Sequence, residues 1–454
     1  MLKVIWFTHD GLGLPIAKRL IDEGNDVTVA QTQTIEELGY GGEEKPEARQ
    51  RRLQVYDGIL DKLPAARVLK AMKKIENKDD YLIIFDFNNL YKLAESAVAM
   101  GFSKGFFPTE EDYLLEKDRD RGKEFVKEHY PHLDVAEVQE FKKVDDAMTF
   151  MEETEDIWVL KGNSDDAKTV VPHTDNPDFA KEQIKDALLA GQKDYETKGF
   201  ILEKKILGIT ELTPEALFWD GKLVATTIDI ENKGFGAASC GPQTGCSSCL
   251  VFKTNLEDEI NNLAFPPIVY QMAKKRKGLF VWDASILCEG DSYYFGEFCS
   301  NRFGWDSILA EMAMAGGPTN FFTKLMAGEN PFEKTFGVTV RGFNMHREED
   351  DRRIGSDITI LMDEEQEKNI WVYDMYKKEG KKYSTGYSWD LAVFTGASND
   401  IIRATDLAYE ALAGFAFEEM YYRPKFDFLS DEYDTSVVTR YRAYNHDLYE
   451  QEDL

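Results

Sequence analysis

The sequence predicts a mixed protein of several domains, part α/β and part α+β, and three observations support this class. Apolar runs alternate with helical stretches over residues 1–115, which is typical of a doubly wound α/β domain. Apolar segments separated by turn residues follow one another over 199–304, as in antiparallel sheets. Strands and helices alternate again after Asn330, which predicts a C-terminal domain with a mixed sheet. Because 454 residues exceed one ordinary core, we expect about three domains.

The first domain begins with a buried strand over Leu2 to Phe7. Apolar residues at helical spacing follow from Leu14 to Ile21, and Gly24 with Asn25 ends that helix. The same reasoning predicts six further elements: a strand over 27–30, helices over 47–63 and 65–76, a strand over 81–87, a helix over 89–101 and a short strand over 105–107.

In the central part of the chain, helices and strands at first alternate, and pairs of antiparallel strands joined by turns then follow. A charged helix is expected over 116–129, a strand and helix over 135–153, and a strand over 156–164 with Lys161 near its end. Asp220 and Gly221 are a hairpin signal between antiparallel strands. The remaining predicted strands are 199–208, the pair within 212–229, and a hairpin over 279–304 that turns at 289–291.

The C-terminal part is predicted to contain four strands, over 336–343, 357–362, 370–376 and 391–398, and an amphipathic helix over 401–421. From Phe428 the chain is acidic and rich in tyrosine, and we interpret residues 428–454 as an appended tail.

Charge and composition exclude several classes of partner. The chain has 83 Asp and Glu against 54 Lys and Arg, a net charge of −29, which repels duplex nucleic acid and anionic membranes. This acidity reflects either solubility or an acidic recognition surface. The apolar runs fall short of the ~20 residues of a membrane span. Residues 1–9 lack a secretory pattern and the five cysteines suit a reducing compartment, so we expect a cytoplasmic protein. We expect it to be a monomer or a homodimer.

The stretch "DGLGLPI" tests whether the first domain binds a dinucleotide. That fingerprint requires G-x-G-x-x-G and an acidic residue at the end of the second strand. Gly11 and Gly13 are present, but Ile16 takes the third position and Gln31 follows the second strand. An NAD oxidoreductase is therefore disfavoured. Two interpretations stay open: an anion site at the helix N-terminus, or a tight turn without a ligand.

A stronger pattern occurs in "FGEFCSNRFG". Glu297 and Asn301 offer the oxygen ligands that Mg²⁺ prefers, and Arg302 can hold a carboxylate or phosphate through two hydrogen bonds. The set suits Mg²⁺ on ATP phosphates beside an anionic substrate.

Residues upstream of this motif complete a nucleotide site. Lys161 can meet phosphate at its strand end, and Glu211 can accept ribose hydroxyls. Glu203, with the apolar Leu202 and Ile206, can frame an adenine edge.

These parts occur in the order of an ATP-grasp enzyme, and the chain resembles the phosphoribosylamine-glycine ligase family up to about Phe426. "GPQTGC" resembles the family's G-P-N-T-G-G, "GEFCSNRFG" its L-E-F-N-A-R-F-G, and "LEKDRDRGKEF" its first phosphate segment. The helix that ends in "YYR" resembles the family's C-terminal helix. The resemblance implies four regions: a domain over 1–115, an ATP-grasp domain over 116–328 with a lid at about 133–197, a C-terminal domain over 329–427, and the tail.

The resemblance also implies a two-step reaction. A carboxylate takes the γ-phosphoryl group of ATP, and an amine then displaces phosphate to form an amide. Mg²⁺, or Mn²⁺ in its place, would bind Glu297 and Asn301, with Asp283 as a further candidate. Arg119 and Lys161 would hold phosphates, and Arg302 and Lys233 would act in catalysis. The implied small-molecule substrate contacts are Gly11, Gly13, Gly241, Pro242, Gln243, Thr244 and Gly245.

Departures from the family concern the substrates. "DGLGLPI" lacks the family's arginine and histidine that contact phosphoribosylamine, and the lid loop after Lys161 contains two aspartates in place of glycines. We expect glycine or another small amino acid to be joined to a phosphorylated or nucleotide-like amine; the alternative is an ATP-binding homologue without ligase activity. Cys240, Cys246 and Cys249 could bind zinc or line a pocket as small residues.

Overall fold

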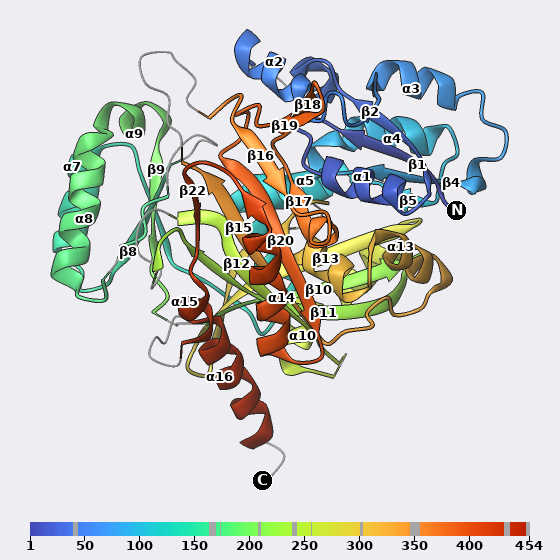
Figure 1. Cartoon of the computed structure of the whole chain (residues 1–454). Coiled ribbons are helices and arrows are strands. Elements are labelled where there is room, and N and C mark those ends of the chain that lie inside the picture. The colour runs from blue at the N-terminus through green and yellow to red at the C-terminus, as the bar shows by residue number, and fades with distance from the viewer. Residues whose placement is uncertain are drawn as a thin grey trace.

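The protein combines one large mixed sheet with two smaller sheets and flanking helices (Figure 1). The computed structural model describes residues 1–39, 44–162, 169–172, 174–207, 210–237, 243–255, 257–299, 303–345, 355–430 and 436–450. The mixed α/β class predicted from the sequence is confirmed. Among these residues, every helix is too short or too polar to cross a bilayer.

The N-terminal strands are parallel and ordered β5-β4-β1-β2-β3. β1 (Lys3–Thr8) pairs with both β2 (Asp26–Gln31) and β4 (Tyr81–Phe85), and helices cover it on both faces, which explains its continuous apolar sequence. The other elements here are α1 (Leu14–Asp22), α2 (Pro46–Gln54), β3 (Lys62–Pro64), α3 (Ala65–Met72), α4 (Tyr91–Ala99) and β5 (Gly105–Phe106).

The parallel strands continue directly into the antiparallel centre of the molecule. β5 pairs with β13 at Phe106 and Leu279, so one sheet of 15 strands runs through both regions. The central strands are β10 (Thr210–Trp219), β11 (Lys222–Gly234), β12 (Gln243–Lys253), β13 (Leu279–Glu289) and β14 (Ser292–Phe298), with the short β6 (Asp134–Val135) beside β14. The helices of this region are α10 (Glu259–Ala264), α11 (Pro267–Lys274), α12 (Asp306–Met314) and α13 (Pro318–Ala327).

A separate three-stranded sheet projects from one side of the large sheet (left in Figure 1). It consists of β7 (Val138–Phe141), β9 (Phe200–Lys204) and β8 (Trp158–Gly162), covered by α7 (Val144–Glu152), α8 (Pro177–Ala190) and α9 (Gln192–Lys198). Leu160, Phe200 and Leu202 belong to its own hydrophobic cluster. We call this unit the lid; its position in the chain agrees with the predicted lid region, although the domain boundaries remain predictions.

The C-terminal strands extend the large sheet at its other edge, where β15 (Phe336–Asn344) pairs with β12 and β20 (Asp390–Ser398). β17 (Ile370–Val372) and β22 (Met420–Tyr422) flank them, and α14 (Ile401–Ala413) packs on this edge. A small sheet contains β16 (Thr359–Met362), β18 (Tyr376–Lys378), β19 (Lys381–Tyr383) and β21 (Phe415–Ala416).

Three predicted helices differ most from the structure in their limits. The helix expected over 401–421 ends at Ala413, because Gly414 stops it and the chain turns into β21 and β22. The single helix expected over 116–129 is two helices, α5 (Glu110–Lys117) and α6 (Arg119–His129), because the Asp118 carboxylate caps the second by accepting from the Arg121 amide at 3.1 Å. The helix expected over 47–63 ends at Gln54, just before Tyr56 adopts a φ of 67°.

The C-terminal tail is packed against the body of the protein. After α15 (Lys425–Leu429), α16 (Val437–Glu450) lies beside β11. Val437 and Val438 are buried in the main hydrophobic cluster. The segment interpreted from its composition as an appendage is thus anchored by apolar side chains at the start of α16.

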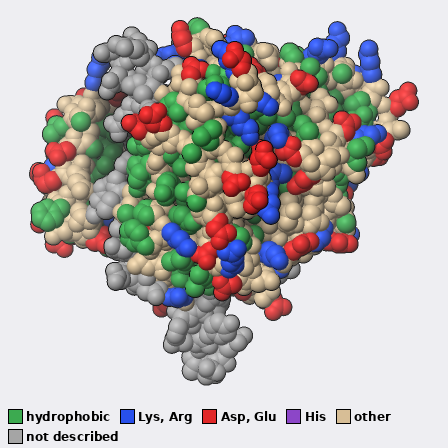
Figure 2. Space-filling model, in the orientation of Figure 1, with side chains coloured by type: hydrophobic (Ala, Val, Ile, Leu, Met, Phe, Trp, Pro, Cys, Tyr) green, Lys and Arg blue, Asp and Glu red, His purple; other side chains and the backbone are tan. Residues whose placement is uncertain are grey.

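Charges of both signs are interspersed on the surface. Figure 2 shows acidic and basic side chains side by side over one face, and the described part of that face has no continuous basic stripe. This distribution gives nucleic acid no extended positive surface there.

Candidate functional site

A cavity of about 550 Å³ lies where the lid meets the central strands and α6. We call it the lid cavity. Its volume is in the range of small-molecule sites. Seven residues that were singled out from the sequence line this cavity together: Arg119, Lys161, Glu203, Ile206, Glu211, Lys233 and Glu297.

Two lysines share one carboxylate on the lid side of this cavity. Lys161 of β8 contacts Glu203 Oε1 on the neighbouring β9, and Lys123 Nζ of α6 lies 2.5 Å from Oε2. Burial alone would raise the pKa of Glu203, but the two ammonium groups outweigh it and lower that pKa. The pKa of Lys161 is lowered by burial despite Glu203. Two cations for one ionised carboxylate leave a positive excess, which suits a polyphosphate.

Lys123 was not singled out from the sequence. It lies four residues after Arg119, on the same face of α6, and both residues line the lid cavity. That i,i+4 spacing was the available signal, but in a helix of mixed charge it does not distinguish a binding face from a solvated one.

A second group of charges centres on Lys233 at the end of β11. Its Nζ lies 2.7 Å from Glu211 Oε1, 3.3 Å from Glu297 Oε1 and 3.8 Å from Glu231 Oε2. Burial opposes the charge, yet these three carboxylates raise the pKa of Lys233 well above its usual value. Ser285 also donates to Glu211 Oε1. Lys233 therefore links β10, β11 and β14 electrostatically at the cavity wall.

A smaller cavity of about 190 Å³ adjoins the first and shares Lys233 and Glu297 with it. We call it the acidic cavity, because six carboxylates and one lysine line it: Glu116, Glu215, Asp229, Glu231, Asp283 and Glu297, with Lys233. Burial raises the pKa of Asp283 to about 7 and that of Glu231 to about 8. A cation entering this cavity would replace protons there.

The donor set is compatible with Mg²⁺ only in part. Glu297 and Asp283 both offer carboxylate oxygens to the acidic cavity. Within the described ranges, no three acidic, histidine or cysteine side chains are arranged to hold a metal alone. Mg²⁺ is commonly held by one or two carboxylates plus substrate phosphates, so two carboxylates fit the ion when ATP supplies other ligands. The predicted Asn301 and Arg302 lie outside the described residues.

Other predicted residues are placed differently. Leu202 is fully buried in the lid core and is not among the residues that line the lid cavity. Thr244 donates to the Lys233 carbonyl at 3.0 Å, and Gly245 lines the acidic cavity. A Cβ at Gly245 would lie 2.9 Å from the Trp305 ring, so the close packing favours glycine. Gln243 begins β12, whereas Gly241 and Pro242 lie outside the described residues.

The structure disfavours zinc binding, one of the two alternatives for the cysteines. Cys246 and Cys249 are fully buried on β12, and burial raises the pKa of the Cys246 thiol to about 12. Zinc needs thiolates, and burial works against them here. Cys240 lies outside the described residues.

Gly11 and Gly13 form a turn whose amides are already bonded. The Gly11 amide donates to Thr8 Oγ1 at 3.0 Å and the Gly13 amide to Asp86 Oδ2 at 2.9 Å. A Cβ at Gly13 would lie 2.4 Å from the Trp6 ring, which explains the glycine. Of the two interpretations, the tight turn describes this geometry; Gly11 still lines a further cavity.

The tail contributes one residue that composition did not single out. Arg440 of α16 lines the lid cavity and is almost fully buried. Its guanidinium donates to the Glu231 carbonyl at 3.0 Å and to Asn232 Oδ1 at 2.7 Å. It holds the backbone just before Lys233.

The chain is similar to known proteins in its structure. No protein-family model matches the sequence, and no curated protein matches it. Among solved structures, phosphoribosylamine–glycine ligase from Thermotoga maritima superposes with a TM-score of 0.61 over 93% of this chain and 99% of that chain, at 15% identity. The chain has an ATP-grasp fold.

Two other solved structures support the ATP-grasp fold. A biotin carboxylase–β,γ-ATP complex from Campylobacter jejuni gives a TM-score of 0.57 over 97% of this chain and 99% of that chain, at 13% identity. The ADP complex of purK, an N5-carboxyaminoimidazole ribonucleotide synthetase, gives 0.51 over 91% and 97%, at 15% identity. At these identities the comparison establishes the fold and leaves the reaction to be argued from the site.

Proposed function

We propose that the protein is an ATP-dependent carboxylate–amine ligase that forms an amide through an acyl phosphate and releases ADP and phosphate. The observation that carries this proposal is the lid cavity, whose lining combines the pair Lys123 and Lys161 at Glu203 with Lys233 at Glu297. The sequence suggests glycine or another small amino acid as the carboxylate.

The lid side of the cavity suits the nucleotide. Arg119, Lys123 and Lys161 would neutralise the phosphates, and Ile206 offers an apolar contact for the base. Glu297 and Asp283, with Asn301, would hold Mg²⁺ or Mn²⁺, which offsets charge on the β- and γ-phosphates when bound. Neither step needs a covalent enzyme intermediate, so positioning and charge neutralisation by these residues would carry most of the catalysis.

The bonds would change in two steps. In the first, a carboxylate oxygen bonds to the γ-phosphorus and the bond from that phosphorus to ADP breaks. In the second, the amine nitrogen bonds to the acyl carbon, the carbon–oxygen bond to phosphate breaks, and the nitrogen loses a proton. The nitrogen gains positive charge during attack, and the carboxylates of the acidic cavity would stabilise it.

The test measures products with purified protein, Mg²⁺, ATP, glycine and a panel of amines. ADP and phosphate should appear only when both substrates are present, whereas AMP and pyrophosphate would contradict the mechanism. Glu297→Gln should abolish turnover, because it removes a carboxylate shared by both cavities. Asp291→Asn, at the exposed tip of the same hairpin, is the matched control and should retain activity.

A second candidate is an ATP-binding homologue that lacks ligase activity. One observation favours it: the Glu203 carboxylate already forms ion pairs with both Lys123 and Lys161, so these two ammonium groups are engaged. Tight ATP binding without amide formation across amines and amino acids would support this candidate.

A further inference from the structure

A third cavity, of about 430 Å³, lies between the glycine turn and the C-terminal strands. We call it the aromatic cavity. Four rings and two carboxylates dominate its lining: Phe87, Trp305, Tyr373 and Tyr387, with Asp10 and Asp390. No lysine, arginine or histidine occurs among its described lining residues.

The backbone beside this cavity has no amide left for an anion among the first residues of α1. The Gly11 and Gly13 amides donate to Thr8 and Asp86. The Leu14 amide donates to the Gly11 carbonyl, Pro15 has no N–H, and the amides of residues 16 and 17 donate to the Gly13 carbonyl. Apart from the Leu12 amide, the turn and the start of the helix therefore lack the free donors that bind phosphate in other proteins.

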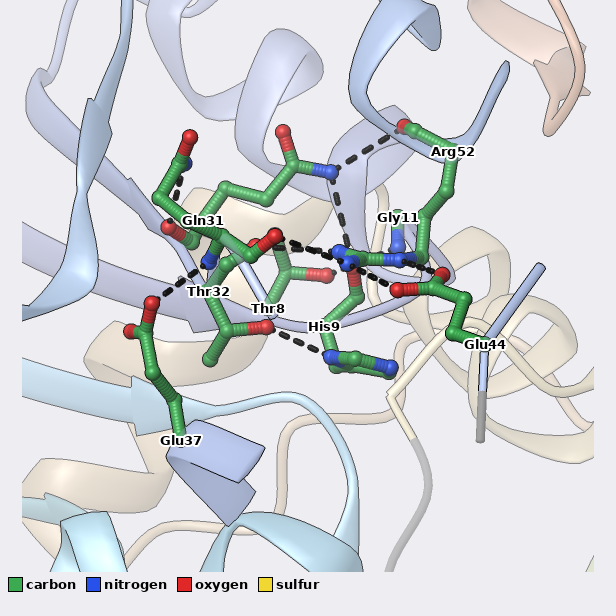
Figure 3. A network of polar contacts seen from close by, with 9 residues as sticks. Thr8, His9, Gly11, Gln31, Thr32, Glu37, Glu44 and Arg52 are labelled. Atoms are coloured by element: carbon green, nitrogen blue, oxygen red, sulfur yellow. Dashed lines mark hydrogen bonds and ion pairs between the residues drawn. The ribbon is translucent and has the colours of Figure 1, made fainter. Parts of the chain in front are cut away.

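The basic side chains near the turn are also engaged (Figure 3). Arg52 is fully buried and donates to the carbonyls of His9 at 2.9 Å and Thr32 at 3.0 Å, and its Nε lies 2.6 Å from Glu44 Oε1. His9 Nδ1 lies 2.5 Å from Thr32 Oγ1, and burial lowers the pKa of its imidazole. Neither group is available to neutralise a phosphate.

The lining has the chemistry of a cation site. Asp10 Oδ1 is buried and has no hydrogen-bond partner within the described part of the chain, and an unpaired carboxylate oxygen favours a donor or a cation as its partner. Aromatic faces attract organic cations through the negative charge of the ring face. Trp305 and Tyr373 already attract one cation, since the Arg341 guanidinium lies 5.5 Å and 5.9 Å from their ring centres. Arg341 itself is paired with Asp306 and Asp390.

The aromatic cavity also borders the proposed reaction site. Trp305 lines both it and the acidic cavity, where Glu297 and Lys233 lie. Trp305 is therefore the wall common to both cavities, and a nitrogen that reached past its ring would meet the carboxylates.

We propose that the amine substrate carries a second cationic group and no phosphate, that this group binds beside Asp10 against Tyr387, and that the reacting nitrogen points past Trp305. The proposal rests on the proposed ligase function for the reacting nitrogen, whereas the cation site itself can be tested without turnover. It replaces the phosphorylated acceptor expected from the sequence.

Calorimetry with the full chain and no nucleotide tests the site, using agmatine as the dicationic probe and O-phosphoethanolamine as the phosphorylated one. Agmatine should bind saturably and O-phosphoethanolamine should not. Asp10→Asn should weaken agmatine binding about tenfold, because a charge-assisted contact is lost. Asp26→Asn, an exposed aspartate at the opposite end of the same sheet, should leave it unchanged.

Tyr387 provides a second pair of variants in case Asp10→Asn impairs folding. Tyr387→Phe keeps the ring and should retain agmatine affinity, whereas Tyr387→Leu should lower it severalfold. Equal affinity in Asp10→Asn and wild type, or tighter binding of O-phosphoethanolamine, overturns the proposal.

The ADP assay separates this inference from the proposed function. ADP release with phosphorylated amines alone would overturn the dicationic acceptor and leave the ligase intact. Agmatine binding that depends on Asp10, with no ADP released for any substrate pair, would refute the ligase and leave the cation site standing.

Discussion

Single residues would allow the lid cavity to attract phosphate, as the proposed function requires, in a chain of net charge −29. Lys123 of α6 and Lys161 of β8 contact one carboxylate, Glu203, and Arg119 of α6 lines the same cavity. The local potential is set by these few groups at the cavity, because exposed charges farther away are screened within about 8–10 Å at ordinary salt.

Lys123→Gln should raise the Kd for Mg–ATP about tenfold, since one of the two ammonium groups at Glu203 is lost. Fluorescence or calorimetric titration would measure it. Arg121→Gln is the control, because Arg121 is exposed on another face of α6. Unchanged affinity in Lys123→Gln would mean that phosphate does not bind beside Glu203.

The acidic cavity should make stability depend on pH. Burial raises the pKa of Asp283 to about 7, while an unfolded aspartate titrates near 4, so the native state binds more protons between these values. The contribution of Asp283 to the unfolding free energy is therefore present below pH ~4 and lost as pH rises to about 7. The unfolding free energy, measured with urea at pH 5, 6 and 7, should decline less with rising pH for Asp283→Asn than for wild type. Asp291→Asn should reproduce the wild-type slope, and identical slopes in all three proteins would contradict the assignment.

At the scale of elements, α16 joins the tail to the site. Arg440→Ala would leave the Glu231 carbonyl and Asn232 Oδ1 without this donor, next to Lys233. The expected loss is roughly 1–3 kcal/mol in unfolding free energy, together with weaker ATP binding. Arg442→Ala on the exposed face of the same helix is the control. If both variants behave alike, α16 stabilises the protein without shaping the site.

Elements with a strong local pattern could be predicted from the sequence, and those fixed by distant contacts could not. The buried run of β1 and the hairpin signal at Asp220 and Gly221 identify their strands locally. The burial of Val437 depends on a surface far away in the sequence, so composition alone suggested an appendage. For the same reason Lys161 and Glu211, which lie near strand ends, could be identified as site residues from the sequence. Arg440 could be identified only from the packing of α16 against the site.

At the scale of the whole molecule, the sites lie where structural units meet. The large sheet is continuous through the pairing of β5 with β13, but the lid has its own sheet and hydrophobic cluster. The lid cavity is closed by contacts between these two bodies, among them the ion pair from Lys123 to Glu203. A nucleotide there would contact both and so couple their motions.

Hydrogen exchange should detect this coupling. The lid can open by breaking few contacts to the large sheet, so amides of β8 and β9 should exchange faster than those of β10 and β13 in the free protein. Saturating Mg–ATP at ~100 times its Kd adds about 2.7 kcal/mol to the state that binds it, so opening that breaks the site should become about 100-fold rarer. Exchange in β8 and β9 should slow accordingly, whereas α3 and α4, on the far N-terminal sheet, should be unaffected. Lys123→Gln at the same ATP concentration should lose most of this protection. Equal slowing throughout the molecule would instead mean that the lid and the large sheet open as one unit, and protection confined to α3 and α4 would place the nucleotide outside the lid cavity.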